Sequence, residues 1–290
     1  MLAENELTRL RDFARQIRIE TLKTLGNLGF GHIGGAMSIV EVLAVLYGGV
    51  MRVDPQNPDL EERDWLVVSK GHAGPALYAT LALKGFFPVE MLLTLNQGGT
   101  RLPSHCDRNL TPGVDMTTGS LGQGMSTGLG VALGHRMSGK DNGVYVILGD
   151  GECQEGQVWE GALYGGNAQL DNLIVFVDDN KQQLDGYTKD INSLGDLRQK
   201  WETFGWHAQL VDGHDVAAIH GAIYKAKETK GKSSVIILDT VKGKGCTFAE
   251  GVKLNHHMRF TPDQIKEAID ALECNGAEKG GVDSEGKARH

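Results

Sequence analysis

Short apolar runs of strand length alternate with helix-length segments along most of the chain. The strongest strand patterns lie at 144–148 and 172–177, and the stretch between them, roughly 154–168, has the length of a helix. The apolar spacing from Leu7 to Leu25 predicts an amphipathic first helix. Weaker strand patterns occur at 65–68, 206–211 and 235–238. Strands that alternate with helices indicate an α/β fold, with a mostly parallel sheet and helices on both faces.

Polar residues follow each of the two central strands. Asp150 lies between two glycines directly after the first strand, and Asn180 closes the second. A strand, a crossover helix and a parallel strand bring both strand ends to the same edge of a sheet, where open α/β sheets bind ligands. We therefore expect Asp150 and Asn180 to meet in space, although they are far apart in the sequence.

Oxygen ligands at one sheet edge favour a hard cation that holds a phosphate group. Magnesium takes oxygen ligands in an octahedron and shares them with substrate or cofactor phosphates. We expect Asp150, Asn180 and the backbone carbonyl of Gln182 to bind Mg²⁺ or Ca²⁺, while the glycines let the main chain approach a diphosphate. The structural alternative is a plain Gly-Asp-Gly turn followed by an unrelated Asx turn.

Composition and charge narrow the class of protein. A chain of 290 residues, 40% of them hydrophobic, can bury one substantial core. The formal net charge of −8 argues against a nucleic-acid partner. No apolar run is long enough to span a bilayer, no secretory signal is visible, and the four cysteines show no metal-ligand spacing. We therefore expect a cytoplasmic protein that has reduced thiols and does not bind membranes.

The motifs resemble those of one enzyme family. The run GDGECQEGQVWEGA at 149–162, followed by NLIVFVDDN at 172–180, closely resembles the thiamine diphosphate signature of transketolases. Further segments resemble the family in the family's own order: GFGHIGGAMS at 29–38, SKGHAGPALYA at 69–79, LPSHCD at 102–107, PGVDMTTGSLGQG at 112–124 and VKGKG at 241–245. The resemblance extends from about residue 10 to residue 270 and covers only the family's first domain.

The resemblance implies a set of active-site residues. It implies a catalytic role for His32, His72, His105 and His256. It implies cofactor contacts for His72, Gly119, Ser120, Leu121, Asp150, Gly151, Glu152, Asn180, Lys242 and His256. A lone loop histidine would be interpreted as structural, so the hypothesis depends on four segments matching together. His257 departs from the glycine that most family members carry at this position.

Other charged residues have a structural alternative. Lys242 is either close to the active site, as the resemblance implies, or a surface lysine in a flexible turn. The resemblance puts Glu160, and less directly Glu155, near a subunit interface, where buried carboxylates could share protons between paired sites. Without the resemblance, both would be interpreted as helix-surface carboxylates.

The implied activity is transketolase chemistry, dependent on thiamine diphosphate and magnesium, in which a two-carbon unit moves from a ketose to an aldose. The sugars are expected to be phosphorylated. We expect residues 1–272 to form the diphosphate-side domain and residues 273–290 a polar tail. The pyrimidine-binding half is missing, so the chain is either cut from a longer protein or one half of a naturally split enzyme. We expect the natural split, because the chain ends in a polar tail and not in the opening strand of another domain. Its partner would be a C-terminal transketolase subunit, with two copies of each chain in a heterotetramer.

Two other hypotheses remain open at this stage. The chain could be a subunit of another thiamine diphosphate enzyme, similar to deoxyxylulose phosphate synthase or to a ketoacid dehydrogenase. The histidine loops and the VWEGA and VDDN runs favour transketolase. The chain could also be a non-catalytic cofactor-binding module. Asp150, Asn180 and the histidine loops are all intact, which argues against a module that has lost its catalytic function.

Overall fold

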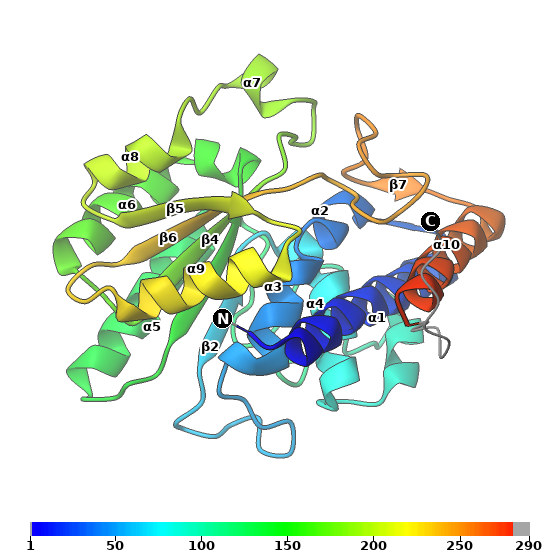
Figure 1. Ribbon diagram of the computed structural model, residues 1–290, viewed down its shortest axis with the longest axis horizontal. Helices are drawn as coiled ribbons and strands as arrows, with labels where there is room; N and C mark the ends of the chain where they lie inside the picture. The colour runs from blue at the N-terminus through cyan, green and yellow to red at the C-terminus, as the bar shows by residue number, and fades with distance from the viewer. Residues whose placement is uncertain (1, 281–290) are drawn as a thin grey trace, which may run out of the picture.

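A parallel sheet of five strands forms the centre of the computed structural model (Figure 1). The structure describes residues 2–280, and within helix α10 it describes side chains only through residue 274. The strand order is β2–β3–β4–β6–β5, and every pair is parallel. The strands are β2 (Trp65–Val68), β3 (Val144–Gly149), β4 (Leu173–Asp179), β5 (His207–Asp212) and β6 (Ser234–Asp239). The predicted α/β fold with a parallel sheet is confirmed.

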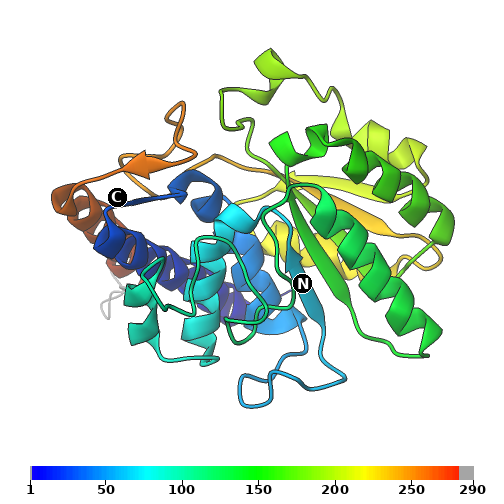
Figure 2. The ribbon, with the colours of Figure 1, turned by 180° about the vertical axis from the view of Figure 1, so that it is seen from behind.

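Helices cover both faces of this sheet, so the central strands are apolar nearly throughout. Alternate side chains of β3 enter different hydrophobic clusters: Tyr145 and Ile147 join one, and Val146 and Leu148 join the other. The first cluster takes buried side chains from α1 (Glu4–Leu28), α2 (Ile33–Met37), α3 (Val40–Val45), α4 (Gly74–Lys84), α9 (Val216–Glu228) and α10 (Pro262–Gly280). The second takes them from α5 (Gln123–Met137), α6 (Gly156–Ala168) and α8 (Leu197–Thr203), with α5 and α6 drawn in green in Figure 2.

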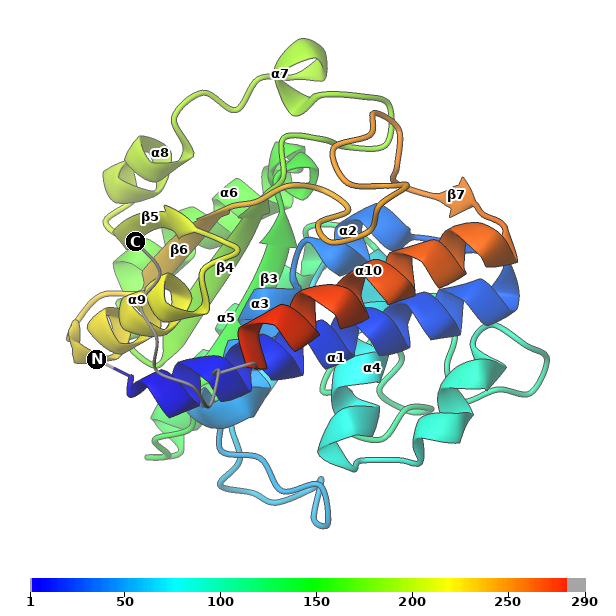
Figure 3. The same cartoon turned by 45° about the vertical axis from the view of Figure 1, so that its right-hand side comes forward.

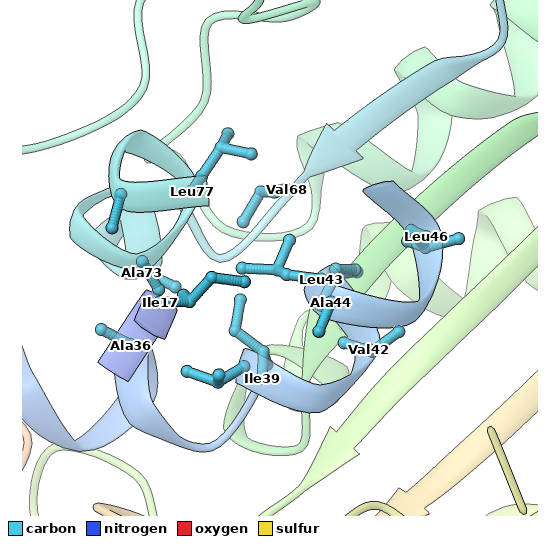
Figure 4. Close-up of a cluster of buried hydrophobic side chains, with 14 of the residues drawn as sticks. Ile17, Ala36, Ile39, Val42, Leu43, Ala44, Leu46, Val68, Ala73 and Leu77 are labelled. Carbon is cyan, nitrogen blue, oxygen red and sulfur yellow. The ribbon is translucent and has the colours of Figure 1, made fainter. Parts of the chain in front are cut away.

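The first cluster joins the N-terminal helices to the sheet. Figure 4 shows Ile17 of α1, Leu43 of α3 and Leu77 of α4 together with Val68 of β2. Helix α1 also packs along α10, and the two run side by side in Figure 3. The expected boundary between domain and tail, at residue 272, falls inside α10, and residues 281–290 lie outside the described residues. The division into domain and tail stays a prediction.

The remaining short elements lie mainly in the loops between these layers. A two-stranded antiparallel sheet pairs β1 (Phe30–Gly31) with β7 (Met258–Arg259). Short helical turns are α7 (Thr188–Ile191), η1 (Leu46–Val50), η2 (Gly71–Ala73), η3 (Val89–Thr94) and η4 (Gly151–Gln154). Because η4 precedes the crossover helix α6, this helix begins at Gly156, whereas the sequence predicts a start near residue 154. Within residues 2–280, no helix combines the length and the apolar character needed to cross a membrane.

Close packing of α6 gives a testable expectation for stability. A Cβ added at Gly166 would lie 1.8 Å from the backbone carbonyl oxygen of Phe204, which cannot move away as a flexible side chain could. We expect Gly166→Ala to lower the free energy of unfolding by at least about 2 kcal/mol in urea titrations. Gly221→Ala on α9 is the matched control, because a Cβ there meets nothing within 4 Å. The control should raise stability by roughly 0.5–1 kcal/mol, and an equal effect of both changes would contradict the packing argument.

Candidate active site

A cavity of about 320 Å³ opens at the carboxyl edge of the sheet. Most of the residues predicted from the sequence line it: His32, His72, His105, Gly119, Leu121, Asp150, Gly151, Glu152, Asn180, Gln182, Lys242 and His256. Ser120 is in the same loop but is exposed and does not line the cavity. A larger hollow of about 430 Å³, beside Arg52 and Lys227, contains none of the predicted residues.

Four strand ends supply the polar lining. The chain leaves β2 at Lys70 and His72, β3 at Asp150, β4 at Asn180 and β6 shortly before Lys242. Because neighbouring strands are parallel, these residues lie at the same edge of the sheet although they are far apart in the sequence, as predicted.

The predicted histidines form one cluster. The ring centroid of His32 lies 5.7 Å from that of His72, 5.4 Å from His105 and 5.3 Å from His256. The pairing of β1 with β7 sets Gly31 beside Met258 and so brings His32 and His256 together. His257, which departs from the family pattern, also joins the cluster, with its ring centroid 4.8 Å from that of His32.

Burial favours the neutral form of the four predicted histidines, His32, His72, His105 and His256. Removal from water lowers the pKa of His32 to about 4 and that of His256 to about 3, and nearby cationic or imidazole groups add to both shifts. The pKa of His72 is lowered well below its usual value by burial and by Lys70, and burial lowers that of His105 as well. A neutral imidazole has one donor and one acceptor nitrogen, which suits it to exchange protons with hydroxyl groups.

Asp150 carries a buried carboxylate that needs a cation. Its side chain accepts hydrogen bonds from Gly151 N at 2.9 Å and from Thr188 Oγ1 at 3.3 Å. Burial, followed by the charge of Asp178, raises the pKa of Asp150 to about 7. A divalent cation bound to this carboxylate would favour its charged form and reverse the shift.

Asp178, at the end of β4, orients the side chains around it. It is fully buried and accepts hydrogen bonds from Ser38, Lys70, Asn180 and Thr240. Because Asn180 Nδ2 donates to Asp178 at 2.7 Å, its Oδ1 is turned the other way and accepts from Gln182 N at 3.1 Å. The role of this amide oxygen as a metal ligand stays a prediction.

Lys242 reaches the cavity, as one of the two sequence hypotheses holds. Its Nζ donates to the carbonyl oxygen of Gln182 at 3.2 Å and lies 3.4 Å from His256 Nδ1. Burial and the nearby Lys70 lower the pKa of Lys242 to about 8. The ammonium of Lys242 suits a negatively charged ligand, whereas that of Lys70 is already paired with Asp178.

The predicted metal ligands fit a hard cation that needs further oxygens. Asp150 and Asn180 offer side-chain oxygens, and Gln182 offers a carbonyl, whereas sulfur and imidazole ligands are not in the set. Within the described part of the chain, no three His, Cys, Asp or Glu side chains are grouped to hold a metal by themselves. A cation here would therefore complete its octahedron with phosphate oxygens and water.

Glu152 ties the glycine-rich loop to the strand ends. Its buried carboxylate accepts hydrogen bonds from Ser69 Oγ, from Gly122 N at 2.8 Å and from Gly149 N at 3.0 Å. These protein donors already occupy the carboxylate, so Glu152 shapes the cofactor loop from behind. Its direct contact with a cofactor stays a prediction.

Some lining residues were missed in the sequence: Lys70, Gly149, Gln154, Gln183 and Leu184. Lys70 is part of the SKGH run, and its charge beside a predicted histidine was a usable signal. Glu155 lines the cavity, whereas Glu160 is exposed on α6 together with Leu163 and Tyr164. The predicted position of Glu160 at an interface stays a prediction.

Comparisons with known proteins agree with this geometry. The family model "Transketolase, thiamine diphosphate binding domain" matches residues 10–287. The 6-deoxy-6-sulfo-D-fructose transketolase subunit SqwG of Clostridium sp. (strain MSTE9) is 54% identical over 92% of this chain and 98% of its own length. An apulose-4-phosphate transketolase subunit of Phocaeicola vulgatus is 39% identical over 82% of this chain and 85% of its own.

Solved structures show the same fold. A transketolase from Pichia stipitis superposes with a TM-score of 0.86 at 32% identity, over 92% of this chain but 40% of that one. The sheet, the cavity and the matched motifs define a thiamine diphosphate-binding α/β domain. The chain belongs to the transketolase family and spans less than half the length of the full-length transketolases that it matches. The predicted family and the predicted organic cofactor are confirmed.

Proposed function

We propose that this chain is the diphosphate-binding subunit of a split transketolase, which moves a two-carbon unit from a ketose to an aldose. The observation that carries the proposal is one cavity that combines four neutral histidines with Asp150, Asn180 and Lys242. The match over nearly the full length of a named transketolase subunit, compared with 40% of a full-length enzyme, supports the split. The composition is consistent with a cytoplasmic enzyme.

In this proposal, Mg²⁺ or Ca²⁺ is held by Asp150, Asn180 and the carbonyl of Gln182, and the cation and Lys242 neutralise a diphosphate. Lys70 lies near the same edge, where its ammonium pairs with Asp178. Bound thiamine diphosphate supplies a nucleophilic thiazolium carbon and an acceptor for the electrons of the broken carbon–carbon bond. The assignment of the metal depends on oxygen donors alone, which suit a hard cation.

The histidines would move protons on and off the sugar hydroxyls. At neutral pH their lowered pKa values leave each imidazole unprotonated, so that one ring nitrogen can accept a hydrogen bond from a sugar hydroxyl and the other can donate one. Since a lysine ammonium can only donate, Lys242 fixes His256 Nδ1 as an acceptor and leaves the imidazole proton on Nε2. His256 would then donate a hydrogen bond from Nε2 to a substrate oxygen.

We propose a sugar with a terminal anionic group as substrate. The two subunit relatives are named for a sulfonated ketose and for a phosphorylated one. This chain is more similar in sequence to the subunit named for the sulfonated ketose. A 6-sulfonated ketose is therefore a second substrate class to test beside sugar phosphates. An assay with donor sugars that differ only in this terminal group separates the two classes.

Assembly tests the proposed function. We expect the isolated chain to be inactive and to gain ketol transfer when mixed with a pyrimidine-binding subunit, because the cofactor would lie between the two. The complex should contain two copies of each chain, as a symmetric interface requires. The measurements are product formation by chromatography and mass by light scattering. The isolated chain turning over as fast as the mixture would contradict the proposal.

A further inference from the structure

A buried ion network lies behind the loop that carries Lys242. Glu41 of α3 binds Arg18 of α1 through two contacts, Nη1 to Oε1 at 2.6 Å and Nη2 to Oε2 at 2.8 Å. Glu41 Oε2 also lies 3.1 Å from His214 Nδ1. The side chains of Arg18 and Glu41 are 8% and 9% exposed, and that of His214 is 14% exposed. None of the three lines the cavity.

The hydrogen bonds fix the tautomer of His214. Val241 N donates to His214 Nε2 at 2.8 Å, so Nε2 carries no proton. The imidazole proton is therefore on Nδ1 and is donated to Glu41. Although burial alone would raise it, Arg18 and His214 together hold the pKa of Glu41 at about 2. The carboxylate is thus charged at any physiological pH and binds both partners.

The network holds the loop on both sides of Lys242. His214 accepts from the backbone at Val241, and Arg18 Nε donates to the carbonyl oxygen of Lys244 at 2.9 Å. Between these points lies Gly243, whose φ of 84° is in the left-handed region. The turn is closed by Lys244 N, which donates to the carbonyl oxygen of Val241 at 3.1 Å, and the carbonyl oxygen of Lys242 accepts from Gly251 N at 3.1 Å. The network adds to these bonds a contact at each end of the turn.

Lys242 needs such restraint because its position is unfavourable. The side chain is 3% exposed, and within the described residues no carboxylate lies within ion-pair distance of its ammonium. Its neighbours in the cavity are the carbonyl of Gln182 and the ring of His256. The charges of Asp150 and Asp178 act on this ammonium only from a greater distance, and a buried cation without an ion pair is stabilised by moving into water. A loop released from its anchors would let the ammonium do so.

We propose that Arg18, Glu41 and His214 are positioning residues, an ion clamp that keeps Lys242 in the cavity for the diphosphate. The ion clamp is these three side chains, and it acts through the backbone at Val241 and Lys244. The inference rests on the proposed function, since it takes Lys242 to bind the cofactor. It assigns a role to His214, which the sequence alone presents as an ordinary histidine.

Two substitutions at His214 separate its two hydrogen bonds. In His214→Gln the terminal amide oxygen can take the place of Nε2 and accept from Val241 N, whereas in His214→Asn the shorter amide can reach only Glu41. With the full chain and its partner subunit, we expect His214→Asn to weaken binding of thiamine diphosphate, at fixed Mg²⁺, about tenfold by calorimetry. His214→Gln should stay within about threefold of the unchanged protein.

His220→Asn on α9 is the matched control and should leave the affinity unchanged, because His220 stacks on Tyr224 away from the cavity. The cofactor-free His214→Asn and His214→Gln variants should unfold at similar temperatures, since each keeps one of the two hydrogen bonds of His214. If His214→Gln lost as much affinity as His214→Asn, the contact with Val241 would not be the anchor and the clamp would be overturned.

A double-mutant cycle tests whether the effect passes through Lys242. We expect Lys242→Met to weaken cofactor binding, and His214→Asn added to it to cost less than about twofold more, because the clamp then has no ammonium to hold. A full tenfold loss from His214→Asn in the Lys242→Met background would overturn the clamp while leaving the role of Lys242 intact. Normal cofactor affinity in Lys242→Met alone would instead overturn the proposed role of Lys242 and, with it, the purpose of the clamp.

Discussion

Asp150→Ala is expected to abolish the metal-dependent binding of thiamine diphosphate. Asp150 supplies the charged ligand of the proposed metal site, and its carboxylate has no cation partner of its own within the described residues. Even an outer-shell partner of a metal ligand is worth 10–100-fold in affinity, so loss of the ligand should cost at least about a hundredfold. Calorimetric titration of the assembled enzyme, with and without Mg²⁺, measures the effect.

Asp239→Ala is the matched control for this experiment. Asp239 ends β6 at the same sheet edge, but it is exposed and pairs with the exposed Lys181. An exposed pair of this kind contributes little, so cofactor affinity and stability should change only slightly. Unchanged cofactor affinity in Asp150→Ala would show that the carboxylate is not a ligand, and an equal loss in both variants would point to a general effect of charge.

The meeting of Asp150 and Asn180 could be predicted because it depends on local rules. Two apolar strands and a helix-length connection imply parallel strands, and parallel strands imply a shared edge. The structure bears this out through the pairing of β3 with β4, where Gly149 lies opposite Asp178. No long-range information was needed for this part of the fold.

The histidine cluster could be expected only from the family resemblance. His32 and His256 are brought together by β1 and β7, which are two residues long each and carry no periodic signal. Pairing between such distant segments depends on the packing of the whole domain. The resemblance supplied what the pattern of apolar residues could not.

The buried polar networks were missed for a different reason. Asp178 directly follows the apolar strand pattern at 172–177, and its donors Lys70 and Thr240 come from distant segments. Likewise, His214 is distant in sequence from Glu41, its partner in the clamp. The pattern of one sequence shows which positions are apolar, but it does not show which buried charged residues contact one another.

His32→Ala is expected to lower turnover far more than cofactor affinity. The ring of His32 lies within 6 Å of the rings of His72, His105 and His256, and its lowered pKa of about 4 keeps it neutral, with one nitrogen able to accept a hydrogen bond from a sugar hydroxyl. A positioned acid or base contributes about 10²–10⁴-fold to the rate, and we expect a loss of kcat in this range. Steady-state ketol transfer at saturating cofactor, together with the cofactor Kd, measures both quantities.

His256→Ala should behave differently, because His256 also touches Lys242. Its loss removes an acceptor for the buried ammonium, so both kcat and cofactor affinity should fall. His220→Ala on α9 should change neither. Normal ketol transfer in both active-site variants would rule out a catalytic histidine cluster. Parallel losses of cofactor affinity and turnover in His32→Ala would make His32 a cofactor contact instead of a proton acceptor, because a residue that acts on the sugar alone leaves the cofactor affinity unchanged.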